Sequence, residues 1–371
     1  MCAVTSDISM TTTIAKPLSL SRRKKILFVL AFNTLLVLLC LFGAELALRW
    51  KGLRPWTFPP PDFISETPGT YYRNDPTLGY LSKPGEFRFT QPGAYTFKMT
   101  HLGNGLRITH PLETYSGKEK KEIWIFGCSF TQGWTLDDEE TYPWLLQENF
   151  PDYEIVNFGV AGYGTVQSLL QFREALEKGK KPALVIGTYA SFHDMRNALT
   201  RAWIKTLMTF SGLGVTRPYM RLARDNQVQL FYAPLKYHEV PLARYSALAN
   251  YLDDTYNRSL ESSYHSHEVS KAIIEEFYRL CKANGIDFVV AGIYSDATTN
   301  EMLEYCNSKG MMTVDISVDL SIKKNTNLPY DSHPSAIADQ QYAEKLESFL
   351  CAKIINEPLC SEIDDRANKK Q

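Results

Sequence analysis

IWIFGCSFTQG, residues 123–133, runs from an unbroken apolar segment directly into a serine on a glycine-containing turn. Consecutive apolar residues without polar alternation are typical of a strand that is buried on both faces of a parallel sheet. Ser129 therefore follows a predicted buried strand, where its hydroxyl group is well placed to be an exposed nucleophile. The alternative is that Ser129 caps a following helix, which is a common role for serine after a strand.

Four further apolar runs and three helical patterns surround this stretch. The first strand is predicted at Ile123–Gly127, and the others are predicted at Ile155–Gly159, Ala183–Tyr189, Asp287–Tyr294 and Met312–Ile316. Apolar residues recur at helical spacing in Thr165–Lys178, His267–Asn284 and Ala336–Ile354. Alternation of strands and helices predicts an α/β fold: a three-layer, doubly wound, mostly parallel sheet of five strands.

The remaining segments differ in composition and suggest a domain order. Residues 1–25 are predicted to be a polar, disordered tail, and residues 49–120 a proline-rich spacer followed by a small β-rich lobe. The α/β domain occupies residues 121–354, with an aromatic and basic insertion at residues 200–265 that could be a lid. Residues 355–371 form a charged tail.

The overall composition excludes several classes of protein. A chain of 371 residues that is 44% hydrophobic and 22% charged is neither mainly disordered nor collagen-like. Lys and Arg number 40 against 41 Asp and Glu, so the chain has no basic excess and nucleic acid is not an expected partner. The seven cysteines show no Cys-x-x-Cys pair or zinc spacing. We expect neither a metal nor a cofactor.

One segment is apolar enough to cross a membrane. Residues 26–48 read ILFVLAFNTLLVLLCLFGAELAL, interrupted only by Asn33 and Glu45, and a helix needs about 20 such residues to span the hydrocarbon core. A cleaved signal peptide has an apolar region of only about 7–15 residues, so the length favours an uncleaved, single-pass signal-anchor. Basic residues are more numerous before the segment than after it, which places residues 1–25 in the cytoplasm and the body outside.

Polar residues with catalytic potential follow several of the predicted strands. In an open α/β sheet, ligands bind at the carboxyl ends of the strands. Gly162 lies in a glycine-rich segment after the second strand, and His193-Asp194 follows the third strand. The alternative interpretation of the glycine-rich segment is a purely structural turn. Asp331-Ser332-His333 precedes the closing helix. A histidine can act as a general base, and a neighbouring carboxylate can fix its tautomer.

These blocks resemble those of the SGNH/GDSL hydrolase family over residues 121–354. The matching residues, in the family's order, are Gly127-Cys128-Ser129 with Thr131 and Gly133, then Gly162, then His193-Asp194, then Asp331 and His333. The stretch from Gly79-Tyr80 to Arg107 also resembles the lead-in of membrane-anchored relatives. The resemblance implies a flavodoxin-like sheet, with Ser129 as nucleophile, His333 as general base and Asp331 as its orienting acid. It also implies an oxyanion hole that includes the backbone N–H groups of Ser129 and Gly162.

Three departures from the family pattern concern the site. Cys128 stands where the family has an aspartate, and one residue instead of two separates Asp331 from His333. In the third block, His193 stands where the family supplies an asparagine side chain to the oxyanion hole. An imidazole N–H can donate the same hydrogen bond, and Asn197 is the alternative donor.

The sequence thus predicts a membrane-anchored serine hydrolase that cleaves an ester, such as an O-acyl or O-acetyl group on a glycan or lipid. An O-acyltransferase acting on an exported polysaccharide is the first alternative, because the motifs do not distinguish water from a sugar hydroxyl as the acceptor. A non-catalytic envelope scaffold is the second alternative, and His193 is its main support.

Two further patterns remain open from the residues alone. Cys351 and Cys360 could form a disulfide if the body lies outside the cytoplasm. His265-x-His267 has the look of a metal pair, but it opens a predicted helix without other ligands nearby in the sequence.

Overall fold

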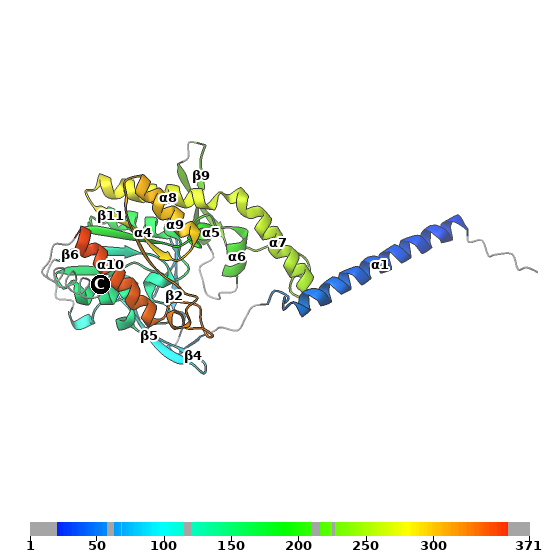
Figure 1. Ribbon diagram of the computed structural model, residues 1–371, viewed down its shortest axis with the longest axis horizontal. Coiled ribbons are helices and arrows are strands. Elements are labelled where there is room, and N and C mark those ends of the chain that lie inside the picture. Colours follow the sequence, from blue (N-terminus) through cyan, green and yellow to red (C-terminus); the bar gives the residue numbers. More distant parts are fainter. Residues whose placement is uncertain are drawn as a thin grey trace, which may run out of the picture. The chain divides into compact units, whose positions relative to one another are not determined.

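The computed structural model describes residues 21–57, 63–67, 69–114, 120–208, 216–224 and 227–354 (Figure 1). The chain divides into two compact units: the chain through Thr57 together with Val240–Asp253, and Phe58–Glu239 together with the chain from Asp254 onward. The tail predicted at residues 355–371 and part of the predicted proline spacer lie outside the described residues, as do residues 1–20 of the tail predicted at residues 1–25. Residues 22–25 of that tail are helical.

The first unit contains the long helix α1 (Arg22–Trp50), which includes the whole predicted span at residues 26–48. The Ser21 hydroxyl accepts a hydrogen bond from the Lys24 N–H at 3.5 Å and caps the start of the helix. None of the residues of α1 is buried. Within the described part of the chain, α1 is the one helix long and apolar enough to cross a membrane, either as an anchor or as a signal sequence.

The second unit is built around a parallel sheet of five strands. These are β6 (Lys121–Phe126), β7 (Tyr153–Asn157), β8 (Leu184–Tyr189), β11 (Asp287–Tyr294) and β12 (Met312–Val318). Their order across the sheet is β12-β11-β8-β6-β7, and each neighbouring pair is parallel. The chain therefore runs from β6 to the edge strand β7, then crosses back to β8. The doubly wound sheet predicted from the sequence is confirmed.

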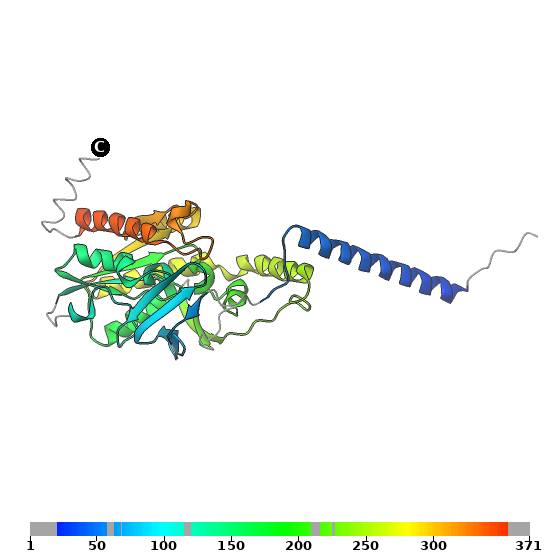
Figure 2. The same ribbon diagram turned by 90° about the horizontal axis from the view of Figure 1, so that it is seen from below.

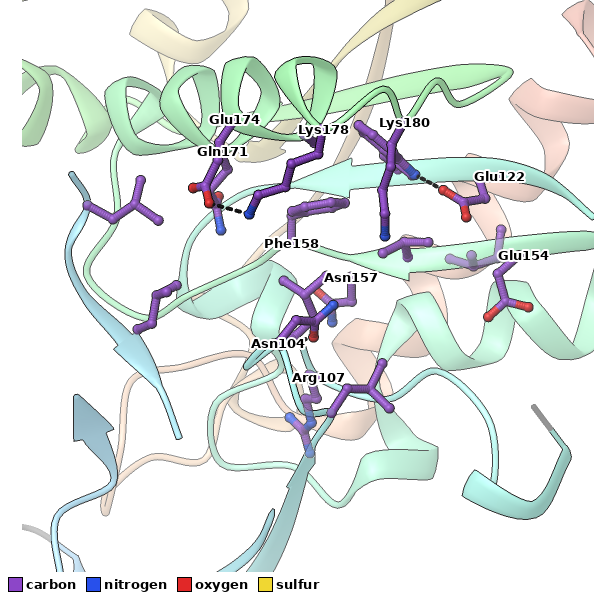
Figure 3. A pocket seen from close by; sticks show the side chains of 18 of the residues that line it. Asn104, Arg107, Glu122, Glu154, Asn157, Phe158, Gln171, Glu174, Lys178 and Lys180 are labelled. Atoms are coloured by element: carbon purple, nitrogen blue, oxygen red, sulfur yellow. Dashed lines mark hydrogen bonds and ion pairs between the residues drawn. The ribbon is translucent and has the colours of Figure 1, made fainter. Parts of the chain in front are cut away.

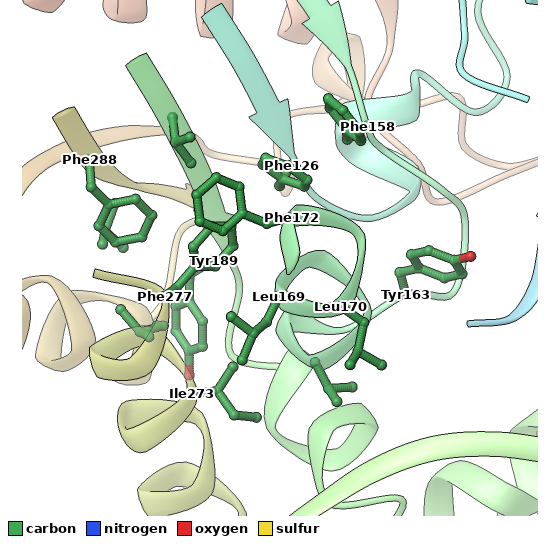
Figure 4. Close-up of a cluster of buried hydrophobic side chains, with 14 of the residues drawn as sticks. Phe126, Phe158, Tyr163, Leu169, Leu170, Phe172, Tyr189, Ile273, Phe277 and Phe288 are labelled. Atoms are coloured by element: carbon green, nitrogen blue, oxygen red, sulfur yellow. The ribbon is translucent and has the colours of Figure 1, made fainter. Parts of the chain in front are cut away.

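Alternation along each strand places side chains on both faces of this sheet. On β6, Trp124 and Phe126 enter one hydrophobic cluster, whereas Ile123 and Ile125 enter another. Helices α4 (Thr165–Glu177), α8 (Ser266–Ala283) and α9 (Ala297–Ser308) supply the first cluster, part of which is drawn in Figure 4. Helices α3 (Tyr142–Asn149) and α10 (Ala336–Lys353) supply the second, and α10 is red in Figure 2. The result is a three-layer architecture.

Short antiparallel strands precede this sheet in the same unit. Strands β1 (Ile64–Ser65), β4 (Gly85–Gln91) and β5 (Tyr95–His101) form one sheet, and β2 (Tyr72–Asp75) pairs with β3 (Gly79–Ser82). Tyr71, Phe87, Phe89, Phe97 and Met99 form the core of this lead-in lobe. Isolated bridges from Arg107 to His101 and to Asn157 connect the lobe to the edge strand β7.

The predicted insertion at residues 200–265 contains regular structure where it is described. It comprises helix α6 (Arg201–Leu207), an antiparallel hairpin of β9 (Thr216–Leu222) and β10 (Val228–Pro234), and helix α7 (Ala247–Tyr264). Short 3-10 turns lie at Leu112–Thr114, Asp138–Glu140 and Lys323–Asn325.

A buried ion pair joins the lead-in lobe to the loop after β6. Arg107 Nε donates to Asp138 Oδ1 at 3.0 Å, and both side chains are almost fully removed from solvent. The remaining guanidinium donors reach the backbone carbonyl oxygens of Lys98, Gln132, Gly133 and Leu136. Removing one partner of such a pair leaves an uncompensated charge in the interior.

We therefore expect Arg107→Leu to lower the free energy of unfolding by about 3–5 kcal/mol. Arg88→Leu is the matched control, because Arg88 pairs with Glu86 at 3.5 Å where both side chains are half exposed. The control should cost only about 0–1 kcal/mol. Urea denaturation of the detergent-solubilised protein measures both values, and equal losses in the two variants would contradict the role given to Arg107.

Candidate active site

The predicted catalytic and oxyanion residues lie in segments that follow the carboxyl ends of strands in the second unit. Ser129 begins the short helix α2 (Ser129–Gln132) directly after β6, and Gly162 lies in the loop after β7. His193 begins helix α5 (His193–Asn197) after β8, and His333 precedes α10. Strands β7 and β8, which come next in the chain, lie on opposite sides of β6, so the strand order reverses at β6 and Ser129 lies at this switch point. Open α/β sheets form their ligand crevices at such switch points.

Ser129, His333 and Asp331 form a continuous hydrogen-bonded chain although Ser129 and His333 are 204 positions apart. His333 Nε2 lies 3.0 Å from Ser129 Oγ, and His333 Nδ1 lies 2.6 Å from Asp331 Oδ1. An ionised Asp331 holds the proton on Nδ1, which leaves Nε2 free to accept from the serine hydroxyl. This arrangement can remove a proton from Ser129 as its oxygen attacks an electrophile.

The electrostatics of Asp331 suit a role as the charged group that orients His333. Burial alone would raise the pKa of its carboxyl, but hydrogen bonds and charge from His333 outweigh burial and hold the pKa below its ordinary value. One of these hydrogen bonds comes from the His333 backbone N–H to Asp331 Oδ1 at 2.7 Å. The same oxygen therefore fixes both the backbone and the ring of His333. The ring is further held by the edge of Phe130, with ring centroids 5.9 Å apart.

The backbone N–H groups of Ser129 and Gly162 are the predicted oxyanion donors, and Gly162 is not among the residues that line the cavity shared by Ser129 and His333. Neither the Ser129 N–H nor the Gly162 N–H donates a hydrogen bond within the part of the chain that the structure describes. Gly162 has a φ of 79°, and a Cβ at this position would come within 2.6 Å of the Tyr80 hydroxyl oxygen. The loop thus requires glycine here, both for its backbone conformation and for space.

The lead-in lobe holds this loop in place. The Tyr80 hydroxyl on β3 donates to the Ala161 carbonyl oxygen, and the Ala161 N–H donates to Gln132 Oε1 at 2.9 Å. Gln132 Nε2 in turn donates to the Tyr71 hydroxyl at 3.0 Å. Sequence reasoning did not identify these positioning residues, because nothing near them in the sequence marks them as partners of Gly162.

The two predicted side-chain donors for the oxyanion lie in different surroundings. Asn197 is fully buried; its Nδ2 donates to Ser270 Oγ at 2.9 Å and its Oδ1 accepts from the Val166 N–H at 2.9 Å. Its amide oxygen therefore caps the start of α4, and its amide nitrogen uses one of its two N–H donors on Ser270 of α8. His193 is also buried, and neither ring nitrogen has a hydrogen-bond partner among the described residues. Burial, together with the charge of Arg196, lowers the pKa of His193 well below its usual range, so the ring is neutral.

Arg196 is the residue of α5 that sequence reasoning missed. Its guanidinium carbon lies 4.4 Å from the centre of the Phe192 ring and 4.8 Å from that of Trp203. Nη1 donates to the Tyr163 carbonyl oxygen at 2.9 Å. Arg196 lines the same cavity as Ser129 and His333. Its one signal in the sequence is a cation three residues after His193, next to a strand end rich in polar residues.

The cavity at Ser129 has a volume of about 580 Å³ and one aromatic wall. Phe130, Phe192 and Tyr294 form this wall, with successive ring centroids 5.5 and 5.4 Å apart. The polar side includes Arg196, Asp319 and Ser321. An apolar wall beside a nucleophile and its base can receive the acyl portion of a substrate.

A larger cavity of about 840 Å³ lies elsewhere, at the edge strand β7 (Figure 3). Its charged rim includes Glu122, Glu154, Lys178 and Lys180, and its lining contains none of the predicted catalytic residues. The chemistry of the Ser129 cavity, not its size, identifies the candidate active site.

The remaining sequence patterns have structural surroundings of their own. His267 Nδ1 lies 2.8 Å from Asp194 Oδ2, and this hydrogen bond raises the pKa of His267. Among the described residues, no group of three or more His, Cys, Asp or Glu side chains is arranged to hold a metal ion. Cys351 is disulfide-bonded, and Cys360, the partner suggested by the sequence, lies outside the described residues.

Comparison with known proteins gives structural neighbours only. No family model and no curated protein sequence matches this chain. A member of the lipolytic G-D-S-L family from Veillonella parvula is 10% identical, with a TM-score of 0.37, over 62% of this chain and 98% of its own. A psychrotrophic esterase, EstA, from Pseudoalteromonas is 12% identical, with a TM-score of 0.35, over 62% of this chain and 95% of its own.

A third solved structure is a two-domain esterase active on acetylated mannans. It is 14% identical to this chain, with a TM-score of 0.37, over 65% of this chain and 51% of its own. These three solved structures are thus a lipolytic protein of the G-D-S-L family and two esterases.

Proposed function

We propose that this chain is a membrane-anchored serine hydrolase that cleaves a carboxylic ester, with Ser129 as nucleophile, His333 as general base and Asp331 as the group that orients His333. The observation that carries the proposal is the hydrogen-bonded chain from Ser129 Oγ through His333 to Asp331, with distances of 3.0 and 2.6 Å. Serine is a weak nucleophile on its own, and an adjacent base oriented by a third group is what activates it.

The reaction proceeds in two halves. Ser129 Oγ attacks the ester carbonyl carbon while its proton passes to His333 Nε2, and Asp331 stabilises the resulting imidazolium. The tetrahedral intermediate then expels the alcohol, which takes the proton from His333, and an acyl group remains on Ser129. Water attacks this acyl-enzyme with His333 again accepting a proton, and collapse releases the carboxylic acid and restores the Ser129 hydroxyl.

The negative charge on the intermediate needs donors that are already in place. The Ser129 and Gly162 N–H groups, which donate no other hydrogen bond among the described residues, supply two. The third donor comes from α5, where His193 and Arg196 are the candidates because Asn197 donates to Ser270 and is not among the residues that line the cavity at Ser129. Donors fixed before the reaction act without reorganisation at the moment when charge develops.

The surroundings of the site and the apolar helix support a proposal for the substrate and for the location of the enzyme. The aromatic wall of Phe130, Phe192 and Tyr294 would receive the acyl group of an O-acylated glycan or lipid. Helix α1 would hold the enzyme at a membrane, with the N-terminus in the cytoplasm and the catalytic body on the other side, because basic residues are denser before the span.

A fluorophosphonate probe tests this proposal directly, because it phosphonylates only an activated serine. We expect the full-length protein in detergent to be labelled and to hydrolyse a short-chain nitrophenyl ester, and Ser129→Ala to lose both properties. Ser295→Ala is the matched control, since Ser295 lines the same cavity without a base beside it among the described residues. Labelling or turnover that survives in a folded Ser129→Ala variant would refute the assignment.

A further inference from the structure

The outer end of α1 is joined to the start of α7 within the first unit (Figure 1). Glu45, which interrupts the apolar span of α1, accepts hydrogen bonds from the Ser246 hydroxyl at 2.7 Å, the Ala247 N–H at 3.0 Å and the Leu248 N–H at 2.8 Å. The two backbone N–H groups are among those that a helix start leaves without intrahelical partners, and a carboxylate is favoured there by the helix dipole. Glu45 therefore caps α7.

Further contacts reinforce this junction. Arg49, one turn after Glu45, pairs with the Glu45 carboxylate at 2.5 Å and donates to the Tyr245 carbonyl oxygen at 3.1 Å. Asn250 Nδ2 donates to the Arg54 carbonyl oxygen at 2.9 Å. The chain after α1 and the segment Val240–Asp253 thus form one hydrogen-bonded body.

The depth of the junction follows from helix geometry. Glu45 lies three residues before Leu48, the last apolar residue of the span, and three residues advance a helix by about 4.5 Å. If residues 26–48 cross the hydrocarbon core, the start of α7 is held within about one turn of its outer boundary. A polar helix start at that depth is tolerated because Glu45 satisfies its N–H groups.

Side chains around the junction are unusually apolar for exposed positions. Tyr245 is 77% exposed, Leu242 68% and Trp50 88%, and Tyr251 and Leu252 on α7 are also exposed. Tyr and Trp concentrate at membrane interfaces, where an amphipathic ring spans the boundary between lipid and water. Exposed basic residues, Lys51, Arg54 and Arg244, accompany them and complement anionic headgroups.

We propose that the segment Val240–Asp253, including the start of α7, is a second membrane contact. It lies in the headgroup layer of a bilayer containing anionic lipid, and the hydrogen bonds from Glu45 hold it there. This inference rests on the proposed membrane anchoring by α1. It assigns to part of the predicted 200–265 insertion a lipid surface as its partner. The first unit then sits on the membrane through two elements in place of a single flexible tether.

Lipid contact can be measured in the full-length protein with a solvatochromic amino acid introduced by amber suppression, which avoids the native cysteines. The protein is reconstituted in vesicles of phosphatidylcholine and phosphatidylglycerol, and the emission is compared with and without dibrominated lipid. We expect brominated lipid to quench probes at Leu252 and Tyr245, as it quenches a probe at Leu38 within α1. A probe at Glu304, an exposed position on α9, is the aqueous control.

The outcomes separate the two proposals. Quenching at Leu38 without quenching at Leu252 and Tyr245 would overturn the second membrane contact and leave the anchor standing. Absence of quenching at Leu38 would overturn the anchor and the inference with it. In Glu45→Ala, quenching at Leu252 should fall while that at Leu38 is unchanged; equal quenching at Leu252 in both proteins would overturn the clasping role of Glu45.

Discussion

Asp331→Asn should lower kcat for a chromogenic short-chain ester by about 10⁴-fold, and His333→Ala by about 10⁶-fold. Asp331 Oδ1 accepts from both the His333 ring at 2.6 Å and its backbone N–H at 2.7 Å. An asparagine amide oxygen can keep one of these bonds, but it no longer carries the charge that stabilises the imidazolium. An amide NH₂ facing the ring would instead hold the wrong tautomer, with Nε2 protonated and unable to accept from Ser129.

The loss in Asp331→Asn should be the same across the neutral range. Because the pKa of Asp331 lies below its ordinary value, its carboxylate is already charged at every pH where an ester assay is practical. Asp319→Asn provides the control, since Asp319 lines the same cavity and its carboxylate accepts hydrogen bonds only from Ser321 among the described residues. A loss of less than tenfold in Asp331→Asn, or an equal loss in Asp319→Asn, would show that Asp331 does not orient the base.

The architecture of the sheet could be predicted because its signals are local. Each of the five strands is a short apolar run, and the observed strands differ from the predicted ones by no more than about two residues at an end, as β6 (Lys121–Phe126) shows. The convergence of Ser129 and His333 could also be predicted, because parallel strands bring their carboxyl ends to one edge. The topology of the sheet therefore predicts the contact between Ser129 and His333, which are 204 positions apart, although no local sequence pattern indicates it.

Contacts that do not follow from the common edge of the parallel strands could not be predicted. The Glu45 side chain meets Ser246 at a separation of 201 positions, and nothing in an apolar helix with one carboxylate specifies which helix start it caps. Tyr80 holds the loop before Gly162 through a lead-in strand whose docking on the sheet has no sequence signature. His193 stands at a family position, but the sequence does not indicate that its ring lies against Tyr189 and Phe192. Nor does it indicate that neither ring nitrogen has a hydrogen-bond partner among the described residues.

Arg196→Met should lower kcat by about 10²–10³-fold with a smaller change in KM, the effect of losing one oxyanion donor. The guanidinium lines the cavity at Ser129, and the faces of Phe192 and Trp203 fix its plane. A donor held in this way interacts more strongly with the tetrahedral oxyanion than with the neutral carbonyl of the ground state, so its removal is felt in kcat. Steady-state kinetics on the nitrophenyl ester measures the division between kcat and KM.

Comparison with His193→Ala decides which side chain of α5 is the third donor. If Arg196 is the donor, the kcat of His193→Ala stays within a few fold of that of the native enzyme. If His193 is the donor, His193→Ala shows the large loss in kcat and Arg196→Met shows the small one. Arg196→Lys should recover only part of the loss, because an ammonium group keeps the charge but not the planar fork of donors.

Because Arg196 also donates to the Tyr163 carbonyl oxygen, a purely structural role of Arg196 must be distinguished from a role as oxyanion donor. Affinity for a boronic acid that mimics the tetrahedral intermediate does so: it should fall in parallel with kcat/KM across the variants, whereas a displaced loop would weaken substrate and mimic alike.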